Sequence, residues 1–218
     1  IILSIIAVFP FIWILLCSVK TNMELTSYPT NLLPKNFTLD NFIHVIKDLE
    51  FSKNIGNSVI IALFTTTIAI IISSMAAYGI VRFFPKLGKI MSKALITTYL
   101  FPPILLAIPY SLVMAKFGLV NTRIGLVIVY LSFSVPYAVW MLVGFFKTVP
   151  IEIEEAARVD GANKFQVFIS IVLPLVAPGI VATAIYTFIN AWNEFLYALI
   201  LINSAEMMTV SVKFRSLQ

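Results

Sequence analysis

Three polar residues stand close together in an otherwise apolar stretch near the end of the chain. Asn190, Asn193 and Glu194 recur at helical spacing, so a helix would present them on one face, with Trp192 pointing elsewhere. Amide groups hydrogen-bond sugar hydroxyls, and an ionisable residue inside a membrane is costly and usually functional. The three residues are therefore predicted to line a passage for solute. The alternative is that Glu194 reaches headgroup water and packs against another helix, with Trp192 as an interface aromatic.

A second informative segment is residues 149–161, whose sequence is VPIEIEEAARVDG. Pro150 suits the first position of a helix, the glutamates suit its first turns, and Gly161 suits a left-handed residue just past its end. Ala156 and Ala157 expose little side chain, so a partner could approach the backbone closely. This helix is predicted to dock into a groove on another protein. The alternative is a helix that merely caps the bundle at the membrane interface.

A further helix is expected to begin near residue 162. Phe165, Phe168, Ile169 and Val172 follow the spacing of one apolar helix face. Pro174 marks the entry into the next apolar run. Residues 147–174 are thus predicted to form a helix-turn-helix outside the bilayer, between two membrane spans.

The remaining side chains offer little further chemistry. Tyr110, Tyr137 and Trp140 are candidates for lining a passage, but packing is the simpler expectation. A single histidine, His44, and a single cysteine, Cys17, exclude a Cys/His metal cluster and an internal disulfide. The chain has no Gly-rich phosphate-binding motif ending in Lys, and its apolar runs hold no catalytic constellation. The chain is therefore not expected to be an enzyme.

The composition of the chain indicates the class of fold that holds these residues. Of 218 residues, 60% are hydrophobic and 11% are charged, whereas about 25% are charged in a soluble domain. So few charges cannot cover a soluble core, and disorder would require the opposite composition. The chain is therefore predicted to be an all-α, polytopic membrane protein. Its net charge of +5 is spread along the chain and gives no nucleic-acid surface.

Apolar runs long enough to cross a bilayer core of about 30 Å predict five membrane spans. They lie at residues 1–19, 54–81, 94–115, 124–146 and 175–202. Pro102, Pro103 and Pro109 are expected to interrupt the third span, and Pro136 is expected to break the fourth. Broken helices around a cavity are typical of transporters, and a simple packing kink is the alternative.

Basic residues orient these spans. Residues 82–93 carry four lysines and arginines, against two in residues 116–123. The positive-inside rule then puts residues 82–93, residues 147–174 and the N-terminus in the cytoplasm. Because the chain opens inside an apolar run without Met, we expect it to be trimmed at its N-terminus.

The spacing of residues 155–174 resembles the EAA loop of ABC importer permeases. Glu155-Ala156-Ala157, three residues, Gly161, nine residues and Ile171-Val172-Leu173-Pro174 match that pattern in full. Other segments resemble the carbohydrate branch of this family: Asn57-Ser58, Ala76-Ala77-Tyr78, Arg82-Phe83, Phe101-Pro102-Pro103, Gly118-Leu119-Val120-Asn121-Thr122 and Ala191-Trp192-Asn193-Glu194-Phe195. The chain is similar to the MalG-type partner of a permease heterodimer rather than to the MalF-type partner.

The resemblance implies a single transmembrane domain of the type I ABC importer fold over residues 1–218. That fold has a six-span core, so the sixth span would follow Gln218 and residues 203–218 would be extracytoplasmic. Residues 147–174 would be the cytoplasmic coupling loop. Glu155 is then a polar contact to the ATPase, Ala156 and Ala157 are the close-packing face, and Gly161 is the turn. Asp160 either contacts the partner or caps the helix locally.

The resemblance also implies the rest of the assembly. It would contain a second, MalF-like permease subunit, a dimer of ATP-binding subunits that carry ATP and Mg, and an extracytoplasmic solute-binding protein. The chain itself would bind no cofactor, and it would import a sugar through a bacterial or archaeal inner membrane. Direct sugar contacts in this family can belong mainly to the other permease subunit. The alternative is an ABC permease for a non-sugar solute, although the spans lack the basic residues expected for anions.

Overall fold

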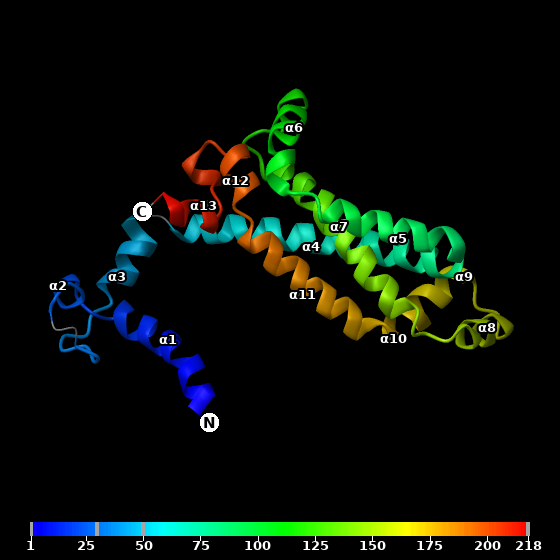
Figure 1. Cartoon of the computed structure of the whole chain (residues 1–218), viewed down its shortest axis with the longest axis horizontal. Coiled ribbons are helices and arrows are strands. Elements are labelled where there is room, and N and C mark those ends of the chain that lie inside the picture. The colour runs from blue at the N-terminus through cyan, green and yellow to red at the C-terminus, as the bar shows by residue number, and fades with distance from the viewer. Residues whose placement is uncertain (1, 29–30, 49–50, 217–218) are drawn as a thin grey trace. The chain divides into compact units, whose positions relative to one another are not determined.

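The computed structural model describes residues 2–28, 31–48 and 51–216, and every element in these ranges is a helix (Figure 1). The elements are α1 (Ile2–Ser18), α2 (Asn22–Leu25), α3 (Asp40–Ile43), the π-helix η1 (His44–Asp48), α4 (Phe51–Arg82), α5 (Pro85–Tyr99), α6 (Pro103–Lys116), α7 (Arg123–Phe146), α8 (Ile151–Val159), α9 (Lys164–Gln166), the π-helix η2 (Val167–Val172), α10 (Leu173–Leu175), α11 (Ala177–Asn193), α12 (Leu196–Leu201), the 3-10 helix η3 (Ala205–Met207) and α13 (Val210–Arg215). They form two compact units, residues 1–53 and 54–218. The predicted all-α fold is confirmed.

In the first unit, a polar stretch folds back onto the end of the apolar helix α1. Lys20 is buried just after this helix, and its Nζ donates to the carbonyl of Asn31 at 2.5 Å. The same Nζ lies 4.8 Å from the centre of the Trp13 ring. The side-chain amide of Asn41 donates to the carbonyls of Ser18 and Lys20. The bond from Asn41 to Ser18 satisfies a carbonyl that the end of α1 leaves unpaired.

In the second unit, α4 and α7 are the two described helices that are long and apolar enough to cross a membrane without interruption. They correspond to the predicted spans at residues 54–81 and 124–146. The prediction that Pro136 breaks the fourth span is wrong, because α7 continues through it. A proline costs one backbone hydrogen bond, which neighbouring helices can offset. Ser73 of α4 donates its hydroxyl to the carbonyl of Val135 at 3.4 Å, a contact that ties α4 to α7 beside the proline.

Two of the other predicted spans are bent. Residues 94–115 are divided between α5 and α6, which are bent by 90° at Pro102 and Pro103, where the sequence predicted an interruption. The interruption predicted at Pro109 is wrong, because α6 continues through this proline. A second bend of 75° separates the segment from Lys164 to Leu175 from α11. If each bent pair is counted as one span, the described residues hold up to four spans, and the apolar part of α1 is shorter than a span. Counted this way, the described helices include counterparts of all five predicted spans, with α1 corresponding to the first of them and two of the others bent.

Two buried apolar clusters lie at opposite ends of α4 and α7. One joins the first half of α4 to α6, the start of α7, α12 and α13, with Leu126, Val129 and Tyr130 at its centre. The other joins the end of α4 to the end of α7, α8 and η2, around Leu142 and Phe146. The second unit therefore has one core near each end of its two long helices (Figure 1).

Candidate functional site

Helix α8 forms where the sequence places its boundary signals. Glu152 and Glu154 lie in its first turn and Arg158 in its last, as the helix dipole favours. Pro150 precedes the helix with φ −61° and ψ 138°, so it is the N-cap residue and not the first helical residue that the sequence predicted. Gly161 adopts a φ of +92°, the left-handed conformation expected just past the helix end.

Helix α8 presents one face to its own chain and one face to the outside. Glu154 and Ala157 are buried, and Ala157 packs into the cluster that contains η2. Ala157 therefore does not belong to the exposed docking face on which the sequence analysis placed it; its small side chain instead lets α8 lie close to the body. The exposed face carries the other predicted contact residues: Glu155, Ala156, Asp160 and Gly161.

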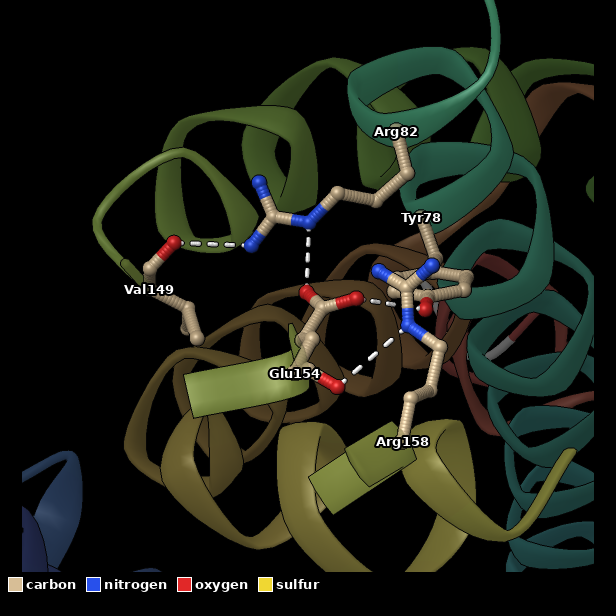
Figure 2. A network of polar contacts seen from close by, with 5 residues as sticks. All are labelled: Tyr78, Arg82, Val149, Glu154 and Arg158. Atoms are coloured by element: carbon tan, nitrogen blue, oxygen red, sulfur yellow. Dashed lines mark hydrogen bonds and ion pairs between the residues drawn. The ribbon is translucent and has the colours of Figure 1, made fainter. Parts of the chain in front are cut away.

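The buried carboxylate of Glu154 is the centre of a polar network that joins α8 to α4 (Figure 2). Its Oε1 accepts a hydrogen bond from Nε of Arg82 at 2.5 Å, and its Oε2 accepts one from the hydroxyl of Tyr78 at 2.8 Å. Nη2 of Arg82 also donates to the carbonyl of Val149 at 2.7 Å, and Nε of Arg158 donates to the backbone carbonyl of Glu154 at 3.3 Å. The Glu154 side chain is 2% exposed and that of Arg82 is 12% exposed. The last turn of α4 is thereby bound to α8 through a buried ion pair.

Sequence reasoning did not single out Glu154. It grouped the three glutamates together as residues that favour the start of a helix. One signal was available: Glu154, Ala157 and Arg158 share the i, i+3, i+4 spacing of one helix face, so a glutamate on the same face as a buried alanine needs a partner. Nothing in the sequence identified Arg82 as that partner.

The segment after Gly161 differs from the predicted amphipathic helix. Phe168 and Val172 are buried as predicted, whereas Phe165 and Ile169 are exposed. A π-helix over residues 167–172 changes the angular spacing of the side chains and turns Val167 inward instead. Phe165 and Ile169 line an apolar groove of about 720 Å³ between α4 and η2.

The three polar residues predicted to line a passage lie together at one cavity. Asn190, Asn193 and Glu194 line a cavity of about 440 Å³ enclosed by α5, α6, α7, α11 and α12. Trp192 does not line it; its ring stacks on Phe188. The grouping of these residues is as predicted, but the predicted continuous helix over residues 175–202 is wrong, because α11 ends at Asn193.

Glu194 lies at the break between α11 and α12 in an extended conformation, with φ −64° and ψ 128°. Its two carboxylate oxygens accept hydrogen bonds from the backbone N–H groups of Tyr197 at 2.9 Å and Ala198 at 3.1 Å. An acidic side chain at the start of a helix satisfies unpaired N–H groups and is favoured by the dipole. Glu194 therefore caps α12, which the sequence analysis did not anticipate.

Aromatic and hydroxyl groups complete the wall of this cavity. Tyr110, which was expected to pack in the core, lines the cavity and donates its hydroxyl to Oγ of Ser132 at 2.6 Å. Tyr197 stacks on Phe133, and its hydroxyl donates to the carbonyl of Pro103 at 2.9 Å. The cavity thus combines amide, carboxylate and hydroxyl groups with flat aromatic surface, the mixture that suits a polyhydroxylated ligand.

The architecture is that of a polytopic helical membrane protein. A short helix with one exposed face lies at one end, and a cavity with polar residues lies between broken helices. The family described as "Binding-protein-dependent transport system inner membrane component" matches residues 69–216, which include α8 and the cavity residues of α11. The chain belongs to this family, and the resemblance to ABC importer permeases inferred from the EAA spacing is confirmed.

Named relatives support the carbohydrate branch. The trehalose transport system permease protein SugB of Mycobacterium tuberculosis is 37% identical over 207 residues, which are 94% of this chain and 74% of that protein. The trehalose/maltose transport system permease protein MalG of Thermococcus litoralis is 34% identical over 97% of this chain and 76% of that protein. The sulfoquinovosyl glycerol transport system permease protein SmoH of Agrobacterium fabrum is 35% identical over 97% and 74%.

A solved structure shows the same fold. A chain of a bacterial ABC transporter involved in the import of the acidic polysaccharide alginate superposes with a TM-score of 0.83 and 23% sequence identity. The match covers 99% of this chain and 75% of that chain. The likeness shows that the two chains share one fold.

Proposed function

We propose that the chain is one permease subunit of an ATP-driven sugar importer and forms half of the translocation pathway. Its partners are a second, MalF-like permease subunit, a dimer of ATP-binding subunits and an extracytoplasmic solute-binding protein. ATP and Mg bind to the ATPase subunits, and this chain carries out no hydrolysis. Three permeases of named sugar systems, each more than 30% identical over nearly the whole chain, support the sugar assignment.

The observation that carries this proposal is the two-sided character of α8. One face is fixed to the body through Glu154 and Ala157, and the other is open and carries Glu155, Ala156 and the Gly161 turn. A nine-residue helix with one exposed face and a tight turn at its end suits a groove on a partner. We assign that groove to the ATPase, with Glu155 as the polar contact. Asp160 is exposed at the turn and serves as an additional polar contact.

The cavity supports the assignment of a polar solute. Asn190, Asn193 and Glu194 supply hydrogen-bonding groups, and Tyr110 and Phe133 supply flat apolar surface. Sugars present hydroxyls at their edges and C–H groups on their faces, so this combination suits them. The residues described at the cavity include no lysine or arginine, so this chain offers an anionic solute no basic partner there. We therefore assign the cavity to a sugar on its way across the membrane.

The orientation follows from the same docking face. If α8 meets an ATPase, the end of the second unit that holds Arg82 and α8 faces the cytoplasm. Residues 82–93 and 147–174 and the N-terminus are then cytoplasmic, in agreement with the excess of basic residues in residues 82–93. Residues 203–218 lie on the extracytoplasmic side, where the binding protein delivers the sugar.

The first experiment is affinity purification of the full-length chain from its native membrane in mild detergent, with mass spectrometry of the proteins that accompany it. Recovery of an ATPase, a second permease and a solute-binding protein supports the proposed assembly. The recovered binding protein is then titrated with trehalose, maltose and a polyamine by calorimetry. Binding of the polyamine alone would remove the sugar assignment and leave the permease assignment intact. A chain that purifies without any ATPase contradicts the docking role of α8.

A further inference from the structure

We infer that Arg82 and Glu154 are positioning residues that carry the movement of α8 into α4. The inference rests on the proposed docking of α8 on an ATPase. The buried Arg82–Glu154 ion pair is the contact that makes α8 and the last turn of α4 move as one body when the ATPase dimer closes.

The hydrogen bonds of Arg82 and Tyr78 fix the position of α8 relative to α4. Arg82 extends from the last turn of α4 and binds α8 with Nε and the preceding loop with Nη2, at the carbonyl of Val149. The planar guanidinium holds these two donors in a fixed fork, so its position defines both the distance and the angle of the α8 segment. The hydroxyl of Tyr78, one turn earlier in α4, holds the second oxygen of Glu154. Three hydrogen bonds from two successive turns of α4 thus meet α8 and its entry loop (Figure 2).

An ion pair at this position is poorly explained as a source of stability alone. Removing two charges from water costs several kcal/mol per ion, and well-packed apolar residues often stabilise as much or more. The surroundings are apolar and aromatic: the ring of Tyr78 packs on Phe146 and Phe168. What the charged pair adds to this apolar packing is a unique geometry between two elements. That is the property a coupling element needs.

Helix α4 provides a route from this contact to the cavity. It is a single helix of 32 residues, and Ser73, nine positions before Arg82, binds the carbonyl of Val135 in α7. On the same helix α7, Ser132 and Phe133 line the 440 Å³ cavity. A displacement of the Arg82 end of α4 therefore reaches the cavity wall through one helix-to-helix contact.

The test measures whether α8 and α4 move together. Spin labels are placed in the full complex at Ile153→Cys on α8 and Met75→Cys on α4, both exposed positions, in a Cys17→Ser background. Distances are recorded without nucleotide and after trapping with ADP and vanadate, so no sugar is needed. We expect one distance maximum, unchanged between the two states, in the wild-type pair. A wild-type distance that changes between the states overturns the inference without any further variant.

Variants of the pair then test its role. In the variants Arg82→Gln and Glu154→Gln, we expect the spin-label distance distribution to show a second maximum after trapping. It should differ from the first maximum by at least about 2 Å, the scale of helix shifts in other switching proteins. The double variant Arg82→Gln/Glu154→Gln removes both charges without leaving one unpaired, and it should show the same shift with better assembly. Arg82→Lys keeps the charge but not the planar fork that also binds the carbonyl of Val149, so it should improve assembly over Arg82→Gln while the second maximum persists. The matched control is Glu152→Gln, an exposed glutamate of the same helix that should not change the distance.

The outcomes separate this inference from the proposed function. If the wild-type chain brings no ATPase, the proposed function fails. If the ATPase is present and the Arg82 and Glu154 variants keep the wild-type distances in both states, the pair is a static anchor and the inference fails while the proposed function stands.

Discussion

The two ends of α4 are held to the rest of the second unit in different ways. At its start, the side-chain amide of Asn54 donates to the carbonyls of Ala205 and Met208, and that of Asn57 donates to the carbonyls of Glu206 and Met208. At its end, the carboxylate of Glu154 accepts two side-chain hydrogen bonds, from Tyr78 and from Arg82, and the second of these is also an ion pair.

The difference is one of redundancy. Asn54 and Asn57 share the carbonyl of Met208, and Ser58 additionally accepts a hydrogen bond from the N–H of Val210, so no single side chain carries this attachment. At the other end, loss of Arg82 leaves the buried Glu154 with one hydroxyl partner. At the start of α4, several neutral hydrogen bonds to backbone carbonyls hold residues 205–210. At its end, the polar attachment of α8 depends mainly on the Arg82–Glu154 pair. An end that must transmit movement is better served by the second arrangement.

The largest effect is expected for Arg82→Ala. The substitution leaves the carboxylate of Glu154, 2% exposed, without a counter-charge, and breaking a buried pair in this way costs about 3–5 kcal/mol. The measurement is the free energy of unfolding of the purified chain in detergent titrated with SDS. The matched arginine at the other end is Arg123, which is exposed and donates to the neutral amide oxygen of Asn57. Arg123→Ala should cost only about 1 kcal/mol, and equal losses for the two arginines would remove the contrast between the ends.

Gly161→Val tests the contrast between the two ends of α4 by changing the backbone turn that follows α8. Gly161 has a φ of +92°, so a β-branched residue there introduces strain of about 1–3 kcal/mol. We expect transport into proteoliposomes to be lost while membrane insertion is intact, because the angle at the docking helix changes. The matched control is Gly118→Val, where φ is +67° and space is open as it is at Gly161. Comparable strain at Gly118 should leave transport largely intact; equal losses at both glycines would point to misfolding and not to coupling.

Asn57→Ala should have a smaller effect. It removes the donor to the Glu206 carbonyl, at a cost of about 1–2 kcal/mol, while Asn54 still holds the carbonyl of Met208. Hydrogen exchange of residues 205–210 should rise modestly in this variant and sharply in the double variant Asn54→Ala/Asn57→Ala. A single substitution that already releases the whole segment would show that the attachment is not redundant.

The smallest effect on stability is expected at Glu194, at the break between α11 and α12. Glu194→Ala removes the cap of α12 and should cost about 1 kcal/mol, and Glu194→Gln should cost less because it keeps one acceptor oxygen for Tyr197 or Ala198. If Glu194 also lines the pathway, both variants reduce sugar uptake or change the ATP hydrolysed per sugar moved. Wild-type transport and ATP hydrolysis in both variants would leave Glu194 as a helix cap alone.

Local patterns in the sequence were sufficient for the parts of the site that depend on neighbouring residues. The glutamates, the alanines and Gly161 defined α8 because capping and turn preferences act within a few positions. The apolar runs at residues 54–81 and 124–146 defined α4 and α7 for the same reason. The grouping of Asn190, Asn193 and Glu194 was also accessible, since their separation is short.

Features that depend on contacts between distant segments were not predicted. The pairing of Glu154 with Arg82 spans 72 positions, and nothing local identifies Arg82 as the partner of Glu154. The π-helix after Gly161 was missed because the apolar pattern fits an ordinary helix equally well, and only packing selects the register that buries Val167. The end of α11 at Asn193 was missed because an apolar run continues through Glu194, while the tertiary structure uses that residue to start a new helix.

The attachment at the start of α4 has a consequence for how the chain is made. Asn54 and Asn57 emerge from the ribosome early, but their partner carbonyls follow 149–154 positions later. At a synthesis rate of about 5–20 residues per second, these amides wait roughly ten seconds or longer for their partners. During that interval the start of α4 has polar groups that only water, lipid headgroups or an assembly factor can satisfy. The hydrogen bonds of Asn54 and Asn57 can therefore form only after residues 205–210 have been synthesised.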